Sequence, residues 1–133
     1  MTLRLPMALA DQLLARMEKD LAALLASARE LMQRRQFAEA SRLLGDGYRQ
    51  LFGLDRRFLQ MMRPEEVAPI LGQPQRLRAF AELMAEEADL LRLQNDVQSA
   101  AATAGWTARI LDAARLRDEV LLARLRALAN LAG

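Results

Sequence analysis

The sequence predicts an all-α protein built from antiparallel helical hairpins, with about five main helices and short helices in the middle. Leu and Ala supply 27 and 25 of the 133 positions, whereas Val, Ile and Thr together supply 8. This ratio favours helix, because Leu and Ala lose less conformational freedom in a helix than β-branched residues do. Apolar residues also recur at spacings of three and four, the period of a helix face. A hydrophobic content of 53% is ample for a packed core.

The first predicted helix is long and covers about residues 8–35. Its apolar positions are spaced by four and three, so they form one continuous stripe. Pro6 is expected just before the helix, where its missing N–H costs little. The members of the stripe are Ala10, Leu14, Met17, Leu21, Leu24, Ala28 and Leu31.

A second helix is predicted over residues 36–52, which completes a hairpin spanning residues 8–53. Gly45 and Gly47 lie inside this helix, where each costs about 1 kcal/mol relative to Ala. They are interpreted as points where two helices approach closely. Gly53 is expected to end the helix in the left-handed conformation.

Residues 54–74 are predicted to form an irregular connector that contains short helices. Asp55 is a cap for the first of these, and Pro64 stands in the first turn of the second. Pro69 and Gly72 limit that second helix to about two turns.

A second hairpin is predicted to follow, with helices over about residues 75–93 and 97–114. Asn95 and Asp96 between them are typical of a turn and a helix cap. The later helix carries a face of small side chains, which allows close helix approach. The residues of this face include Ala100, Ala101, Ala104 and Ala108.

A last helix is expected over about residues 116–131. With the second hairpin it makes up residues 75–133. The two hairpin regions and the connector are interpreted as one helical domain, residues 1–133, which agrees with the usual length of a domain.

One pattern of residues occurs twice, at an offset of 60 positions. In each copy a small residue in a first helix precedes a polar turn, and an apolar residue and Ala open a second helix. Small side chains let two antiparallel helices pack closely, and the apolar residue covers the open end of the pair. The first copy is Ala28, Leu31, Phe37, Ala40 and Leu44, and the second is Ala88, Leu91, Val97, Ala100 and Ala104.

This pattern resembles a tetratricopeptide-type helical hairpin. Ala28 stands at the usual glycine, Phe37 at the usual aromatic residue and Ala40 at the usual alanine. Leu24 and Val97 depart from the pattern, since the repeat usually has Trp and an aromatic residue there. Tandem repeats of this type recur at 34 residues, so the connector interrupts any regular solenoid.

Most of the chain is similar to a family of uncharacterised bacterial proteins with tetratricopeptide-like helix pairs. The similarity rests on the order of the long first helix, the turn at residues 37–40, and residues 51–55, 64–66 and 81–89. The resemblance implies a fold and brings no activity with it.

The charges argue against a nucleic-acid partner. The net charge is +2, and basic and acidic residues alternate along the chain instead of gathering on one helix. No apolar run approaches the ~18–20 residues that span a bilayer, and the N-terminus lacks the features of a signal peptide. We therefore expect a cytoplasmic protein without a membrane partner.

Chemistry that depends on Cys or His is excluded, because the chain contains neither. Glu82, Glu86 and Asp89 share one helix face, and a Mg²⁺ or Mn²⁺ site there would need carboxylates from another helix. We expect instead a solvated acidic stripe that pairs with Arg78 and Arg92. No catalytic residue, metal or cofactor is predicted.

The leading hypothesis is a non-enzymatic module that binds a protein or peptide partner. The resemblance implies that the first helix of each pair lines a concave side, and the candidate groove residues are Arg29, Gln33, Glu82, Asp89 and Arg92. The connector offers a candidate for an exposed apolar patch, because a short segment cannot bury every apolar side chain. Its residues are Phe58, Met61 and Met62.

Two alternatives stay open. The first is a homodimer or larger homo-oligomer, formed through the stripe from Leu14 to Leu31 or through the small-residue face from Ala100 to Ala108. In that case Leu21→Glu is the disrupting change. The second alternative is a small-molecule site between helices that uses Arg and Glu, which a buried cavity containing both would favour.

Overall fold

The structure is a computed structural model that describes residues 4–132 and confirms an all-α fold. Within these residues the chain forms seven α-helices and a final 3₁₀ turn, without strands. The helices are α1 (Arg4–Gln33), α2 (Phe37–Phe52), α3 (Arg56–Gln60), α4 (Pro64–Leu71), α5 (Pro74–Leu93), α6 (Val97–Ala113) and α7 (Glu119–Ala129), and the 3₁₀ turn η1 covers Asn130–Ala132.

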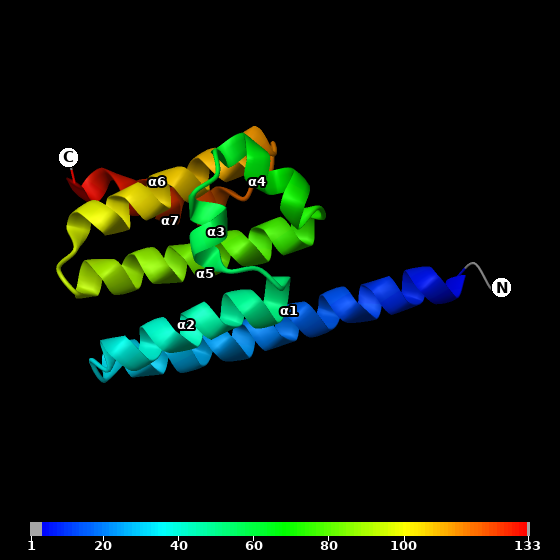
Figure 1. Ribbon diagram of the computed structural model, residues 1–133, viewed down its shortest axis with the longest axis horizontal. Coiled ribbons are helices and arrows are strands. Elements are labelled where there is room, and N and C mark those ends of the chain that lie inside the picture. The colour runs from blue at the N-terminus through cyan, green and yellow to red at the C-terminus, as the bar shows by residue number, and fades with distance from the viewer. Residues whose placement is uncertain (1–3, 133) are drawn as a thin grey trace.

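The helices form two antiparallel pairs, α1 with α2 and α5 with α6 (Figure 1). The last helix, α7, packs against α5 and α6. Figure 1 shows that α1, α5 and α7 all run in one direction and that α2 and α6 run in the other. The helix α5 contacts both α1 and α7, so it lies between them.

The two helix pairs turn in the same way, and the backbone repeats at the predicted offset. Arg35 and Asn95 occupy equivalent positions with φ of 59° and 65°. The next N–H in each turn donates to a carbonyl five residues back, from Gln36 to Leu31 and from Asp96 to Leu91, at 2.9 Å in both. These bonds satisfy carbonyl groups at the end of each first helix.

The small residues of the repeated pattern lie where the paired helices meet. Ala28, Ala40, Ala88 and Ala100 are completely buried, as close packing of antiparallel helices requires. The predicted small-residue face from Ala100 to Ala108 is likewise buried inside the chain. It is therefore unavailable as a subunit interface, and that expectation was wrong.

Two helix boundaries differ from those predicted. The first helix begins at Arg4, so Pro6 lies within its first turn, where a missing N–H breaks no intrahelical bond. The last helix begins at Glu119 because the side chain of Asp118 accepts the N–H of Leu121 and caps it there.

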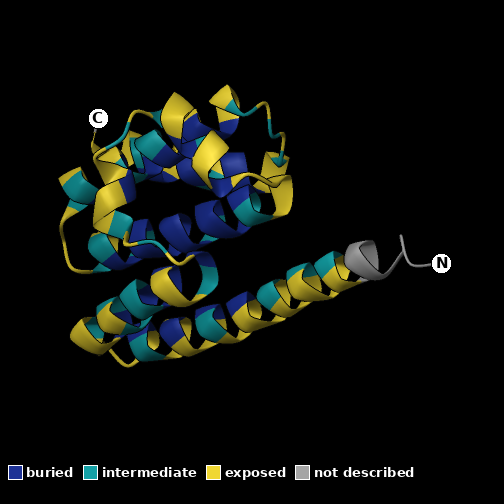
Figure 2. Cartoon of the chain, turned by 45° about the vertical axis from the view of Figure 1, so that its right-hand side comes forward, coloured by how far each residue is buried: buried dark blue, intermediate teal, exposed yellow. Residues whose placement is uncertain are grey.

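The core is a single cluster of apolar side chains to which all seven helices contribute. Phe80 of α5 lies at its centre, in edge-to-face contact with Tyr48, Phe52 and Trp106. The three ring centroids lie 5.8–6.1 Å from that of Phe80, a favourable separation for aromatic pairs. Figure 2 shows the buried residues concentrated along α5 and the helices above it.

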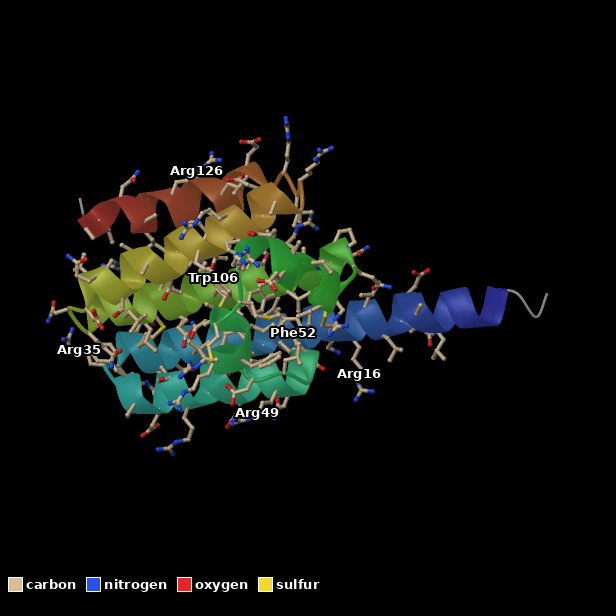
Figure 3. All side chains as sticks on the ribbon, turned by 45° about the horizontal axis from the view of Figure 1, so that its top comes forward. Arg16, Arg35, Arg49, Phe52, Trp106 and Arg126 are labelled. Carbon is tan, nitrogen blue, oxygen red and sulfur yellow. The ribbon has the colours of Figure 1, made fainter. Side chains whose placement is uncertain are left out.

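The connector crosses from α2 to α6 and explains why the hairpins are 60 residues apart. Asp55 caps α3 by accepting the N–H of Arg57, and Gly72 ends α4 with φ of 84°, as the sequence predicted. The helix α4 packs against α6. Trp106 of α6 (Figure 3) donates from its indole N–H to the carbonyl of Met62 at 3.1 Å, which fixes the connector to the second hairpin.

The first part of α1 extends beyond α2 and the rest of the bundle (Figures 1 and 2). Leu9 and Leu13 on this segment are 57% and 61% exposed, and Figure 3 shows Arg16 projecting from it. Further along the helix, Leu21 and Leu25 are buried against the chain itself. The later half of the predicted stripe therefore packs in or against the core, and its first members, Ala10, Leu14 and Met17, are partly buried.

Candidate functional site

A groove runs along the helices α1, α5 and α7, with α5 as its floor. Two adjoining cavities make it up, of about 570 and 710 Å³, and both are lined by Arg29 and Arg124. In the first cavity Leu21, Ala79 and Leu121 give an apolar surface. We call this surface the α1–α5–α7 groove.

Glu86 of α5 stands between the two cavities and joins the three helices. Its side chain is almost completely buried, and Oε2 lies 3.1 Å from Nε and Nη2 of Arg29 and 3.1 Å from Nη2 of Arg124. The hydrogen bond to Glu86 raises the pKa of Arg29. Two cations thus compensate the buried carboxylate, as a buried charge requires.

The expected solvated acidic stripe is therefore wrong for Glu86. Of the two arginines expected to pair with the stripe, Arg92 does so, since its Nη2 lies 2.7 Å from Asp89. Arg78, in contrast, pairs with Asp118, where Nε lies 3.3 Å from Oδ2. Asp118 also accepts the N–H of Leu121, so one carboxylate both caps α7 and binds an arginine of α5.

Glu82 lies one helical turn before Glu86 and lines the first cavity. Within the described chain it has no basic group at ion-pair distance, 4.0 Å or less. Partial burial raises the pKa of its carboxyl, and the charge of Asp118 adds to this effect. The groove therefore contains one half-buried carboxylate whose charge is incompletely compensated.

The structure brings four of the five predicted groove residues together. Glu82 lines the first cavity, Gln33 and Asp89 line the second, and Arg29 lines both. The fifth, Arg92, lines neither cavity and contacts the groove through Asp89. Sequence reasoning missed Glu86 and Arg124, because nothing in the local pattern shows that α7 returns to lie beside α5.

A second polar cluster lies on the opposite side of α5, beneath the connector. Glu87 binds Arg56 of α3, and the hydroxyl of Tyr48 donates to Glu87 Oε2 at 3.2 Å. Burial raises the pKa of Glu87, outweighing the effect of Arg56. Complete burial also raises the pKa of Tyr48 well above its ordinary value.

This cluster borders a cavity of about 480 Å³ that Arg57, Ser99 and Trp106 also line. The ion pair between Glu87 and Arg56 connects the connector to α5. The charges of Arg56 and Glu87 neutralise each other, so we interpret this ion pair as a contact that holds α3 in place.

The predicted apolar patch is formed by two of its three residues. Phe58 is 54% exposed and Met61 85% exposed. Met62 instead packs partly buried against the core, since Trp106 holds its backbone against α6. Its inclusion in the patch was wrong.

The acidic side chains and the helices of residues 4–132 bear on two kinds of partner, metal ions and membranes. Over that span no group of three or more acidic side chains is arranged to hold a metal ion. The carboxylates of Glu86 and Asp89 are bound by arginines instead. None of the helices described combines the length and apolar character needed to cross a bilayer.

Comparisons with family models, with curated proteins and with solved structures find no match to this chain. The resemblance to a bacterial family with tetratricopeptide-like helix pairs therefore stays a prediction.

Proposed function

We propose that this chain is a non-enzymatic protein–protein interaction module that binds a peptide segment of its partner in the α1–α5–α7 groove. The observation that carries the proposal is the combination of an apolar surface and charged side chains in two adjoining cavities along the same three helices. In such a groove apolar side chains of the peptide supply affinity, and polar groups fix its position.

The arrangement of the helices supports this choice of face. The first helix of each pair and the last helix run in the same direction, and α5 contacts both α1 and α7 (Figure 1). The resemblance to tetratricopeptide hairpins implies binding on the same face. A cytoplasmic location also stays a prediction.

The proposal is tested with a phage-displayed library of random dodecamer peptides, selected on the immobilised protein. Ala22→Trp is the test variant, because Ala22 is exposed and lines the first cavity. Ala23→Trp is the matched control, because Ala23 is exposed on the same helix and lines none of the cavities described above.

We expect selected peptides to bind the wild type and Ala23→Trp equally, and to lose at least about tenfold in affinity for Ala22→Trp, since the indole occupies their place. Thermal unfolding of both variants checks that the fold is intact. Failure to select any peptide, or equal binding by all three proteins, would overturn the proposal.

A second candidate function is homodimer formation through the extended segment of α1. The observation that favours it is the exposure of Leu9 and Leu13 on the first part of α1. Burying a leucine side chain fully contributes about 1.5–3 kcal/mol. A symmetric dimer buries Leu9 and Leu13 of both chains, so each contribution counts twice. The originally expected disruptive change, Leu21→Glu, is unsuitable because Leu21 is buried in the core of its own chain.

Light scattering over a hundredfold range of concentration tests the dimer. We expect the mass to rise toward that of two chains for the wild type and for Gln12→Glu, which alters a neighbouring exposed residue. Leu13→Glu should keep the mass of one chain, since a charge is not tolerated in an apolar interface. A constant mass of one chain for the wild type contradicts this candidate.

A further inference from the structure

The charges in the α1–α5–α7 groove are unevenly compensated. The arginines that line its first cavity already form ion pairs within the chain. Arg29 and Arg124 bind Glu86, and Arg78 lies beside Asp118. Turning Arg29 or Arg124 away would leave the carboxylate of Glu86 buried with less compensation, which is costly. These arginines are therefore held in place by carboxylates of the chain itself.

Two carboxylates of the first cavity have no ion-pair partner in the described chain, Glu18 of α1 and Glu82 of α5. Glu18 is exposed, so water solvates it. Glu82 is half-buried, and Asp118 adds a further negative charge near it. Burial and the charge of Asp118 outweigh the attraction of Arg78, Arg29 and Arg124 for the carboxylate of Glu82, so its pKa stays raised. Its charge is thus only partly compensated.

The surroundings of Glu82 fit a long basic side chain. The apolar side chains of Leu21, Leu25 and Leu121 line the same cavity. Lys and Arg place an aliphatic stem on apolar surface and keep the charged head at a polar site. The second cavity offers no equivalent, because Asp89 there is bound by Arg92.

We infer that the peptide bound in the groove carries a Lys or Arg side chain whose stem lies on these leucines and whose charged head binds Glu82. This inference rests on the proposed peptide-binding function and specifies the chemistry of the partner. The first cavity is lined by three arginines and three carboxylates, and two of these arginines already bind Glu86. Four carboxylates thus share three cations around this position, which favours a cation over a neutral side chain.

The first test is the composition of the selected peptides. We expect those selected on the wild type to share one basic position flanked by apolar residues. Selection on Glu82→Gln should lose the basic position, whereas selection on Glu30→Gln should keep it. Glu30 is a matched control because it is an exposed residue of α1, paired with Arg34, that lines neither cavity of the groove.

The outcomes separate the two proposals. Peptides that are blocked by Ala22→Trp but lack a shared basic position would overturn this inference and leave the groove as a peptide site. Failure to select any peptide would overturn the proposed function. If peptides selected on Glu82→Gln still share a basic position, another acidic group binds that side chain, and this inference is overturned.

The second test is a double-mutant cycle on a synthetic arginine-containing peptide from the selection. Citrulline replaces the arginine, since it has nearly the same shape without the charge. Hydrogen bonds to charged groups are among the stronger ones, so we expect citrulline alone or Glu82→Gln alone to weaken binding about tenfold or more. If the two groups contact each other, the losses should not multiply when the changes are combined; losses that multiply fully would overturn the contact.

Discussion

Glu86 and Glu87 are adjacent in the sequence, and their side chains point to different sides of α5. Glu86 faces α1 and α7, where it binds Arg29 and Arg124. Glu87 faces α2 and α3, where it binds Arg56. Adjacent residues on a helix point about 100° apart, so the two carboxylates do not converge on one ligand.

Their burial is not predictable from the sequence. The arginines that bind them are 31 to 57 positions away, so local spacing gives no sign of the pairing. Buried carboxylates are rare without such partners, and an exposed stripe was the natural expectation for charged residues on a helix.

Replacing Glu87 should reveal the effect of burial on its ionisation. In the folded state the pKa of Glu87 is raised from 4.5, so the folded protein binds this proton more tightly than the unfolded chain does. The resulting stabilisation is present at pH values below the unfolded pKa and is lost as the pH rises through the folded pKa. We therefore expect the stability of the wild type relative to Glu87→Gln to fall as the pH rises from about 4 to about 7.

Urea unfolding of the two proteins at each pH measures this difference, and comparing them cancels the contribution of Glu82, whose pKa is also raised. A relative stability of the wild type that increases with pH would show that Arg56 outweighs burial.

At the scale of the helices, the packing of α1 on α2 depends on a glycine. A Cβ built on Gly47 would overlap Cδ2 of Leu24, whereas one built on Gly45 would meet its nearest atom, Cζ of Arg56, at 3.9 Å. Leu24 stands where the tetratricopeptide pattern usually has Trp, and Gly47 is the small residue that accommodates it.

We expect Gly47→Ala to destabilise the protein by about 1–3 kcal/mol, because overpacking outweighs the gain in helix propensity. Gly45→Ala, two residues away in the same helix, should be neutral or stabilising by up to about 1 kcal/mol. Chemical denaturation measures both. A Gly47→Ala variant as stable as Gly45→Ala would show that Leu24 moves without cost.

Most helices could be predicted, because their signals are local. Gly53 ends α2 with φ of 68°, Asp96 accepts the N–H of Ser99 to cap α6, and Pro64 opens α4. The start of α7 was placed too early, since the capping role of Asp118 was not recognised. Capping residues and turn glycines act within a few positions, so the helix ends that they set can be predicted from the local sequence.

At the scale of the whole molecule, the α1–α5–α7 groove is formed by helices that are distant in sequence. Four of its residues were named from the sequence, because the resemblance to tetratricopeptide hairpins implies which side of the first helix of each pair lines a groove. The contribution of α7, including Arg124 and Leu121, was not predicted. Its position depends on how the last turn returns the chain onto α5, which follows from packing and not from a local signal.

The measurement that tests the account most directly is the map of amide chemical-shift changes in the ¹⁵N-labelled protein when a selected peptide is added. The account predicts changes along α5 and on the facing sides of α1 and α7, including Ala22, Glu82 and Arg124, with α2 and α6 little affected. Changes confined to α2, to the connector around Phe58 and Met61, or to the extended segment of α1 would contradict it.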